Sequence, residues 1–475
     1  MMSNMPSPVN AAIAEIAGFL GSRLSVAMAV REHHGHGLSH RGGVPPDAVA
    51  FLHGVEEVSR VLQVCRRLHV PVIPFGAGTS AEDHVAAVNG GICLDLSGMD
   101  RILSVHADDL DVVVEPGVTR KRLNETLRDT GLFFPIDPGA DASIGGMVAT
   151  RASGTNAVRY GTMRDNVLAL QVVLADGTVI RTGNRARKSA AGYDLTRLFV
   201  GSEGTLGVVT EVTLRVHGIP ESIGAAVCSF ASVSQAVRAS IAIMQCAIPV
   251  ARMELMDALQ MRACNAYSRL SYPEQPCLFF EFHGSTSYVA EQAEAARAIC
   301  DDNGGAGFAW AERAEDRSRL WQARHDAYFA ALALRPGVQG WPTDVCVPIS
   351  QLARCIEETR TDLDQAGIMA PICGHVGDGN FHALLLVRMD DAGERAQAEA
   401  ANARLIERAL ALGGTCTGEH GIGRGKLKYM PWEHGPALAV MGRVKSALDP
   451  RGIMNPGKVI PPSVLDEIAQ LIMES

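Results

Sequence analysis

The sequence predicts an α+β protein of at least two domains, and three observations support this prediction. Its 475 residues exceed what one hydrophobic core usually supports. Between Pro45 and Pro220 short strands alternate with short helices and glycine turns, whereas longer helices separate the strands after Pro220. Hydrophobic residues make up 47% and charged residues 20% of the chain, which is typical of a folded globular protein and excludes disorder.

The first half of the chain is expected to contain two helices and a series of buried strands. Apolar residues recur at helical spacing over 55–68, and a short strand follows that helix. A second helix is expected from Thr119 to Gly131. The strands expected from runs of valine and leucine are 92–96, 112–115, 167–174, 178–181 and 208–216.

The second half is expected to alternate helices with strands. The expected helices are 232–246, 288–300, 316–334, 350–365 and 393–412, and the expected strands are 277–282, 344–347, 371–375 and 382–387. The change at Pro220 separates a first domain (45–220) from a second domain (221–425). An N-terminal helical segment (1–44) precedes them, and a C-terminal segment (426–475) follows.

Composition excludes several classes of protein. Lysine and arginine total 43 and aspartate and glutamate 52, so the net charge of −9 disfavours nucleic acid. The 11 cysteines include no C-x-x-C pair, which argues against a zinc ribbon or a disulfide framework and for a reducing compartment. The N-terminus resembles no secretory signal, and no apolar run reaches about 18 residues. We therefore expect a cytoplasmic protein without a transmembrane segment, with peripheral contact at the inner face of a membrane left open.

Loops of small residues are the first candidate site. The loop 74–80 follows a strand, and its glycines let backbone N–H groups approach a pyrophosphate. It lacks the third glycine of G-x-G-x-x-G, so a nicotinamide site is poorly supported. The segments 137–146, 152–156 and 201–207 are equally rich in small residues. A single loop of this kind is more often a tight turn, but together they predict a slot for an extended, phosphate-bearing cofactor.

A histidine pair is the second candidate site. If Asp378-Gly379 forms a two-residue turn, His375 and His382 lie opposite one another on a hairpin, with Cβ atoms about 4.5–5.5 Å apart. That separation lets two imidazoles share one metal ion. The alternative is two surface histidines that flank a turn.

The expected helix 316–334 carries the third candidate site. Trp321, Arg324, His325 and Tyr328 fall on one face, and a mixture of a cation with aromatic rings makes a poor core face. The alternative is that Arg324 forms an ordinary surface ion pair.

Several of these stretches resemble those of a known protein family. Between Pro45 and Val459 it resembles the flavin-dependent oxidoreductases of the vanillyl-alcohol-oxidase type, and most closely the D-lactate dehydrogenases that pass electrons to cytochrome c. The matching stretches are 114–119, 137–146, 152–166, 188–194, 201–207, 374–382, 417–423 and 455–458. The resemblance implies a two-subdomain PCMH-type FAD-binding domain, an α+β cap domain with an antiparallel sheet that binds substrate, and a C-terminal segment that returns to the FAD.

The resemblance also implies roles for residues. FAD would be bound without a covalent bond by the loops, at Pro74, Gly76, Ala77, Gly78, Thr79, Ser80, Pro138, Gly139, Ala140, Ser143, Gly146, Ser153, Asn156, Tyr160, Glu203, Gly207, Val208 and Asn455. Arg324 would hold the substrate carboxylate, which a guanidinium matches in a bidentate manner. Trp321, Tyr328 and Asn380 would complete the substrate site.

For the metal site, relatives use this histidine pair and the glutamate of a Glu-His-Gly segment, here Glu419. On extended backbone the adjacent His420 would point to the other side, which leaves it to act as the base. Such a set suits Zn²⁺, Mn²⁺ or Fe²⁺, among which spacing alone does not choose, and Zn²⁺ or Mn²⁺ is expected. A purely structural metal is the alternative.

Two segments of the sequence differ from the corresponding segments of relatives. Relatives commonly have Leu-Glu-Gly-His where this chain has 81–84, so Asp83 stands in place of a glycine and would repel a pyrophosphate. Pro342 stands where relatives that oxidise D-2-hydroxyglutarate carry a substrate-binding lysine. Without that cation, the second carboxylate of a diacid would be buried unpaired.

The sequence therefore predicts an FAD-dependent dehydrogenase for D-lactate or a related short D-2-hydroxy acid. A hydride would pass from C2 to flavin N5 while the metal acidifies the hydroxyl and His420 takes its proton. Cytochrome c, a quinone or an electron-transfer flavoprotein would accept the electrons. The alternatives are a dehydrogenase for D-2-hydroxyglutarate or glycolate, a metal-dependent hydrolase with a vestigial nucleotide domain, and a flavin subunit that only relays electrons.

Overall fold

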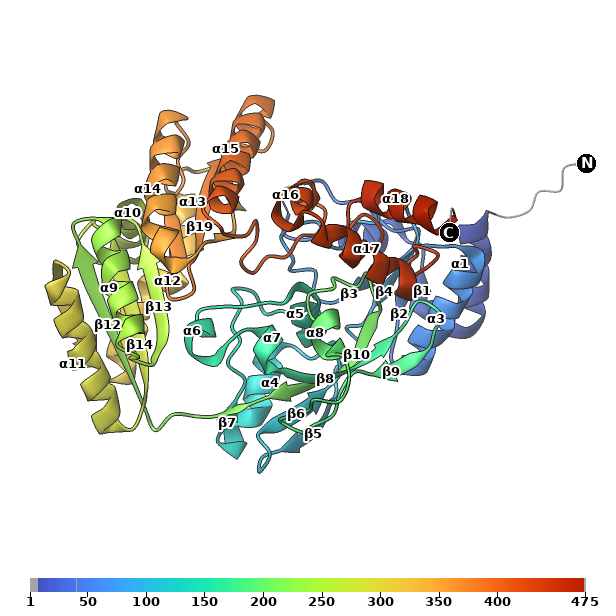
Figure 1. The fold of residues 1–475 in the computed structure, drawn as a ribbon, viewed down its shortest axis with the longest axis horizontal. Coiled ribbons are helices and arrows are strands. Elements are labelled where there is room, and N and C mark those ends of the chain that lie inside the picture. Colours follow the sequence, from blue (N-terminus) through green and yellow to red (C-terminus); the bar gives the residue numbers. More distant parts are fainter. Residues whose placement is uncertain (1–6, 40, 474–475) are drawn as a thin grey trace, which may run out of the picture. The chain divides into compact units, whose positions relative to one another are not determined.

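The computed structural model describes residues 7–39 and 41–473, and Figure 1 shows its fold. The chain forms two compact units. The first comprises the chain up to Ser153, Thr162–Gly218 and the chain from Glu419 onward. The second comprises Gly154–Gly161 and Ile219–Gly418. The break at Gly218 lies close to the boundary expected at residue 220, whereas the transfer of 154–161 to the second unit was not expected.

The first unit contains a four-stranded sheet in the order β1-β2-β4-β3. Strands β2, β4 and β3 run parallel, and β1 pairs antiparallel with β2. Helices α1 and α3 bury their apolar faces in its core. The elements of this part are α1 (Pro8–Leu20), η1 (Gly21–Arg23), β1 (Leu24–Ser25), α2 (Met28–His34), β2 (Ala48–Phe51), α3 (Val55–Leu68), β3 (Val72–Phe75) and β4 (Ile92–Asp95).

Helix α3 shows how the local sequence determines an element. Val58, Val61 and Cys65 are fully buried, as the spacing of its apolar residues predicts. Acidic residues lie in its first turn and basic residues in its last, which complements the helix dipole. The helix ends where His69 adopts a left-handed conformation with φ +56°. The predicted bounds of this helix are confirmed.

A second sheet and core complete the first unit. This sheet is antiparallel, in the order β5-β6-β10-β8-β9, and packs against α4 and α5. Two separate cores in one unit confirm the predicted two-subdomain architecture. The elements are β5 (Ile102–His106), β6 (Asp111–Val114), α4 (Arg120–Leu127), η2 (Arg128–Thr130), β7 (Leu132–Phe133), α5 (Ile144–Thr150), α7 (Met163–Asn166), β8 (Val167–Val173), β9 (Val179–Arg181), α8 (Leu195–Phe199), β10 (Val208–Arg215) and β11 (His217–Gly218).

The C-terminal segment packs into the first unit beside β3. Val72 forms a parallel bridge with Met454, so the chain end extends the edge of the first sheet. Buried Lys445 donates hydrogen bonds to the carbonyls of Thr205, at 2.7 Å, and Met454, at 2.9 Å. The segment is thereby tied both to β3 and to the loop 201–207. Its elements are η3 (Leu427–Tyr429), α16 (Met430–His434), α17 (Ala437–Leu448) and α18 (Pro462–Met473).

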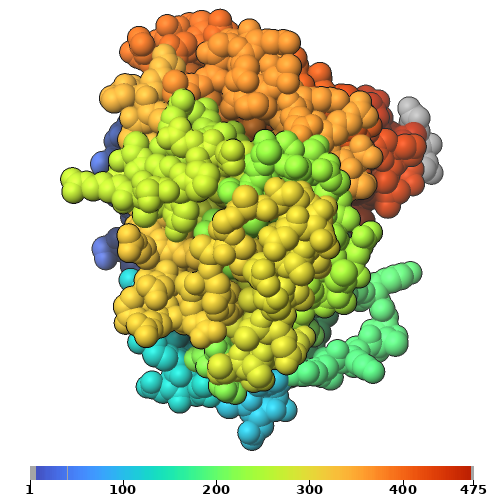
Figure 2. Space-filling view, turned by 90° about the vertical axis from the view of Figure 1, so that its left-hand side faces the viewer, coloured from blue at the N-terminus to red at the C-terminus, as the bar shows by residue number. Residues whose placement is uncertain are grey.

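The second unit is built on one large antiparallel sheet, which confirms the prediction for the cap. Its order is β15-β12-β14-β13-β18-β19-β16, and β17 also pairs with β19. Helix α11, in front and yellow in Figure 2, packs against β12, β14 and β15. Helices α10, α12 and α13 share a core with Phe279.

The bounds of these elements complete the fold. They are α6 (Ala157–Tyr160), β12 (Ser222–Phe230), α9 (Val233–Gln245), β13 (Val250–Met256), α10 (Ala258–Ser268), β14 (Cys277–Gly284), α11 (Thr286–Asp302), β15 (Gly305–Ala311), α12 (Ala314–His325), α13 (Ala327–Ala333), β16 (Gln339–Pro342), β17 (Val345–Cys346), α14 (Ile349–Gln365), β18 (Ile372–His375), β19 (Asn380–Val387) and α15 (Ala392–Ala411). The strands β12, β13, β15 and β16 were not predicted.

Two predicted local structures are wrong. The hairpin of β18 and β19 turns through the four residues 376–379, not two, so that His375 lies opposite Asn380. The predicted single helix 316–334 is two helices, α12 and α13, separated at Asp326. The register error is two residues, and because side chains alternate with a period of two, His375 and His382 still share a face.

Candidate active site

The glycine-rich loop after β3 has the properties of an anion-binding cradle. Among the residues that the structure describes, none accepts a hydrogen bond from the backbone N–H groups of 76–80. The Ser80 Oγ atom is buried without a hydrogen-bond partner. Gly78 has φ +67°, and an added Cβ would lie 2.9 Å from the ring of Phe75. An added Cβ on Gly76 would collide with the Ser143 hydroxyl. Successive backbone N–H groups without an acceptor, on a loop that has no room for a side chain at Gly76 or Gly78, fit a pyrophosphate.

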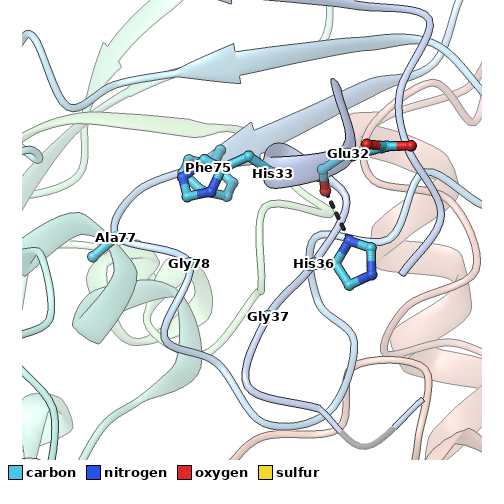
Figure 3. A pocket seen from close by; sticks show the side chains of 7 residues that line it. All are labelled: Glu32, His33, His36, Gly37, Phe75, Ala77 and Gly78. Carbon is cyan, nitrogen blue, oxygen red and sulfur yellow. Dashed lines mark hydrogen bonds between the residues drawn. The ribbon is translucent and has the colours of Figure 1, made fainter. Parts of the chain in front are cut away.

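A cavity of about 370 Å³ adjoins this loop (Figure 3). His36 Nδ1 donates a hydrogen bond to the carbonyl of Glu32, and the rings of His33 and Phe75 lie 6.2 Å apart. The loop is therefore open on the side of Ala77 and Gly78. The residues that line the cavity are Glu32, His33, His36, Gly37, Phe75, Ala77 and Gly78.

The other predicted cofactor residues lie in both units. In the first, Ser143 caps α5 by accepting from the Gly146 N–H at 3.4 Å. Nothing lies within 4 Å of a Cβ added to Gly139. The remaining residues of this group in the first unit are Pro74, Thr79, Pro138, Ala140, Ser153, Glu203, Gly207, Val208 and Asn455. In the second unit, Asn156 Oδ1 accepts from Arg252 Nε at 3.0 Å, and Tyr160 Oη lies 2.7 Å from His283 Nδ1.

Glu203 holds the start of the C-terminal segment within the first unit. Its carboxylate accepts from the N–H groups of Ile422 at 2.7 Å and Gly423 at 2.8 Å, and His84 lies 3.3 Å away. Although burial disfavours the charged form, His84 and these N–H groups lower the pKa of Glu203. The segment that follows His420 is thus fixed at two consecutive backbone positions.

Asp83 is buried in a conformation that favours glycine. Its φ is +60°, its exposed fraction is 2%, and its Oδ2 atom has no hydrogen-bond partner. A left-handed backbone of this kind is the conformation that glycine adopts at the least cost. Burial lowers the pKa of nearby Lys458 to about 8, an effect that Glu203 and Asp83 oppose.

The structure brings the predicted metal ligands together. Ligand atoms of His375, His382 and Glu419 all lie within 4.8 Å of one another, and the two imidazole rings are 5.5 Å apart. Two histidines and a carboxylate at this spacing are a donor set for a divalent transition metal. Glu419 directly follows Gly418, whose N–H donates to Asp344 at 2.8 Å.

Both histidines are oriented by acceptors. His375 Nδ1 donates to Glu254 at 2.6 Å, and His382 Nδ1 donates to the carbonyl of Thr343 at 2.9 Å. Because a carboxylate and a carbonyl can only accept, each Nδ1 atom is the donor, and in the neutral imidazole this tautomer leaves the lone pair that binds a metal on Nε2. Outer partners of this kind are typical of metal sites. The residues present therefore fit a divalent ion.

Asn380 contributes an unused acceptor. Its Nδ2 donates to Asp344 at 2.8 Å and to the carbonyl of Val345 at 2.7 Å, which fixes the amide orientation. Its Oδ1 is buried without a partner. Asn380 lies opposite His375 in the hairpin, so this oxygen is on the strand pair that carries the histidines.

Arg324 lies against the same buried acid as His375. Its Nε donates to Glu254 at 2.8 Å, and its side chain is 21% exposed. The alternative of an ordinary surface ion pair is therefore wrong, because Glu254 is fully buried. Trp321 is a core residue beside Phe279, contrary to the view that this face avoids the core.

Tyr328 and His420 lie in a backbone geometry that differs from the predicted one. The break at Asp326 places Tyr328 on α13 rather than on the helix of Arg324, and it is 46% exposed. Glu419 and His420 lie in an irregular bend and not on the extended backbone that the prediction assumed. Strand geometry therefore does not set their side chains on opposite sides, and the roles of both stay predictions.

Sequence reasoning missed Glu254 and Asp344. Glu254 is a charged residue within an apolar strand, with Met253 and Leu255 buried beside it, and that contrast was a usable signal. Asp344 is fully buried and accepts from Thr417 at 2.7 Å and from Gly418. The contacts of Glu254 with Arg324 and His375, and those of Asp344 with Thr417 and Gly418, do not follow from local spacing, because they join residues 70 to 121 positions apart.

Two protein-family models match the chain. The FAD binding domain matches residues 46–183, and the C-terminal domain of FAD linked oxidases matches residues 219–459. The fold is also that of p-cresol methylhydroxylase with substrate bound, with a TM-score of 0.80 at 16% identity over 97% of this chain and 98% of the other. The protein is thus an FAD-linked oxidoreductase with a PCMH-type fold.

Two relatives narrow the class. The "Probable D-lactate dehydrogenase, mitochondrial" of Danio rerio is 56% identical over 92% of this chain and 89% of its own length. The "D-lactate dehydrogenase [cytochrome], mitochondrial" of Arabidopsis thaliana is 47% identical over 95% of this chain and 80% of its own. The chain therefore belongs to the D-lactate dehydrogenase (cytochrome) family of FAD-linked oxidases.

Proposed function

We propose that this enzyme oxidises D-lactate, or a related short D-2-hydroxy acid, to the 2-oxo acid and passes the electrons to a cytochrome-type acceptor. The observation that carries the proposal is the clustering of His375, His382 and Glu419 in a chain whose relatives are named D-lactate dehydrogenases. The first unit would bind FAD without a covalent bond, and the second would bind substrate. Bound FAD supplies the acceptor for the C2 hydride.

Three side chains would act on the substrate. Arg324 would bind the carboxylate, for which the planar guanidinium is the best match among side chains. His420 would take the proton of the hydroxyl, a role that suits an imidazole near neutral pH. Asn380 would accept a hydrogen bond from the substrate through Oδ1, the atom that is buried without a partner.

A divalent ion, with Zn²⁺ and Mn²⁺ as the candidates, would be held by His375, His382 and Glu419. When bound, it would act as a Lewis acid that makes the substrate hydroxyl easier to deprotonate. The acceptors of both Nδ1 protons support this assignment, because they leave Nε2 as the ligand atom in each histidine.

Substrate size is proposed from β16. Pro342 occupies the position of the lysine in relatives that oxidise D-2-hydroxyglutarate, and Trp341 beside it is buried. A second carboxylate would have no cation at this position, at a cost of several kcal/mol. We expect D-lactate to exceed D-2-hydroxyglutarate at least about tenfold in kcat/KM, a factor worth about 1.4 kcal/mol.

The acceptor and the location complete the proposal. Cytochrome c is the first candidate acceptor, and a quinone or an electron-transfer flavoprotein are the others. No helix within residues 7–39 and 41–473 is long and apolar enough to cross a membrane. The sequence predicts a cytoplasmic enzyme, with peripheral contact at the inner face of a membrane left open, whereas the names of the two relatives place those proteins in mitochondria. Cell fractionation with antibody detection distinguishes the two.

A substrate panel tests the function. Purified protein is mixed without oxygen with D-lactate, L-lactate, glycolate and D-2-hydroxyglutarate, and the visible flavin absorbance is followed. Rapid loss with D-lactate supports the proposal. Flavin that no hydroxy acid reduces indicates a subunit that only relays electrons, and a protein without flavin indicates the hydrolase alternative.

A further inference from the structure

Glu254 joins two side chains of the second unit that are far apart in the sequence. It lies on β13 directly opposite His375 of β18. His375 Nδ1 donates to Oε1 at 2.6 Å, and Arg324 Nε donates to Oε2 at 2.8 Å. Each carboxylate oxygen thus serves one donor, and the carboxylate is fully buried. The proposed metal ligand and the proposed carboxylate anchor are connected through one side chain.

The stability of the sheet does not require an acid at this position. Met253 and Leu255 on either side of Glu254 are core residues. Removing a carboxylate from water is costly, and well-packed hydrophobic residues in place of a buried ion pair are often neutral or stabilising. The two donors, His375 and Arg324, both belong to the proposed site, which indicates that Glu254 serves the site and not the stability of the sheet.

We infer that Glu254 is a positioning residue that orients His375 toward a metal ion and Arg324 toward the substrate carboxylate at the same time. This inference rests on the proposed function. One carboxylate holds the two groups at a fixed separation, and a 2-hydroxy acid carries its hydroxyl and its carboxylate on adjacent carbons. The bridge therefore matches the two binding groups of the substrate to the two functional groups of the protein.

Glu254→Gln is the informative variant because an amide cannot replace both acceptors. If its oxygen faces Arg324, its NH₂ group faces His375 Nδ1 and moves the histidine proton to Nε2, which removes the metal lone pair. If its oxygen faces His375, its NH₂ group opposes Arg324 Nε. In either orientation the acceptor that remains is neutral, and neutral hydrogen bonds are about half as strong as charge-assisted ones.

Two separate probes report on the two contacts of Glu254, with His375 and with Arg324, in the FAD-bound enzyme. Calorimetric titration of metal-free protein with Zn²⁺ or Mn²⁺ reports His375. Competitive inhibition by propionate, a carboxylate without the 2-hydroxyl, reports Arg324. We expect Glu254→Gln to weaken both, with a ten- to hundredfold loss in at least one, the range found when outer partners of metal ligands are removed.

Glu281→Gln is the matched control. Glu281 on β14 is also buried between a histidine and an arginine, with His283 Nε2 at 2.9 Å and Arg252 at 3.5 Å. It bonds neither His375 nor Arg324. We expect its metal and propionate affinities to stay within about twofold of the wild type, since nothing in either proposed arm changes.

The outcomes separate this inference from the proposed function. If the wild type binds metal and the Glu254→Gln variant keeps its affinity for the metal or for propionate within twofold of the wild type, Glu254 does not position both groups. If the wild type binds neither ion, the metal-assisted function fails and this inference fails with it. Should Glu254→Gln not fold, Glu254→Asp keeps the charge but is one methylene shorter, so it should reach only one donor and lose at least one affinity about tenfold. Two unchanged affinities in that variant would equally overturn the inference.

Discussion

Replacing Arg324 with methionine is expected to lower kcat/KM for D-lactate by roughly 10²–10⁴-fold. Hydrogen bonds to charged groups contribute about 1.5–3 kcal/mol each, so the loss of a bidentate contact removes about 3–6 kcal/mol. Arg324→Lys keeps the charge and loses the fork, and a loss of about 1.5–3 kcal/mol corresponds to roughly a 10- to 150-fold decrease. The kcat/KM of Arg324→Lys for D-lactate should therefore lie between that of the wild type and that of Arg324→Met.

The structure adds a second consequence that the assay must control. Arg324 Nε donates to fully buried Glu254, so Arg324→Met leaves that carboxylate with one donor fewer. Thermal unfolding and FAD content of each variant show whether the loss of activity reflects damage to the fold. Arg324→Lys is the gentler variant, because a cation stays near Glu254.

The assay compares D-lactate with (R)-propane-1,2-diol, which has the same hydroxyl and no carboxylate. Initial rates with an artificial electron acceptor give kcat/KM for both. If Arg324 binds the carboxylate, the variants should differ from the wild type with D-lactate but by less than about threefold with the diol, since the missing contact involves only the carboxylate. A variant that retains D-lactate kcat/KM within threefold of wild type would refute the assignment.

Three further predictions concern single residues. His420→Ala should lower the rate about 10²–10⁴-fold while metal content by elemental analysis stays near wild type; if metal is lost here and kept in Glu419→Ala, the two roles are reversed. Asp83→Gly should tighten FAD in fluorescence titrations, most at low salt, because a buried carboxylate with φ +60° is removed; an unchanged affinity at low salt would mean that Asp83 does not face the phosphates. Burial raises the pKa of Asp257 from 3.8 to about 6. Ionisation of this carboxyl group therefore destabilises the fold as the pH rises between these two values. Asp257→Asn should therefore be more stable by about 3 kcal/mol at pH 8, with the gain fading between pH 6 and pH 4 in thermal unfolding; a gain independent of pH would contradict this origin.

Local pattern was sufficient for features that depend on nearby residues. The helix α3 follows from the spacing of its apolar side chains, and the loop 76–80 follows from its glycines after a strand. The shared face of His375 and His382 survived a register error because the error was an even number of residues. Asp83 was recognised as unusual, but its left-handed backbone is visible only in the structure.

Features that depend on tertiary pairing were out of reach. The use of Glu254 requires that β13 pair with β18, and no local signal specifies that pairing. The break between α12 and α13 and the burial of Trp321 depend on the core that these helices share with β14. The assignment of 154–161 to the second unit likewise depends on contacts such as Arg252 with Asn156.

Metal-assisted oxidation of D-lactate is tested most directly by the reduction of bound flavin with and without metal. The FAD-bound enzyme is stripped with a chelator, its visible spectrum is recorded, and D-lactate is added without oxygen. We expect that the stripped enzyme keeps its FAD, that its flavin is reduced at least about 100-fold more slowly, and that Zn²⁺ or Mn²⁺ restores the rate. Full-rate flavin reduction in stripped enzyme with no detectable metal would contradict a metal-assisted reaction.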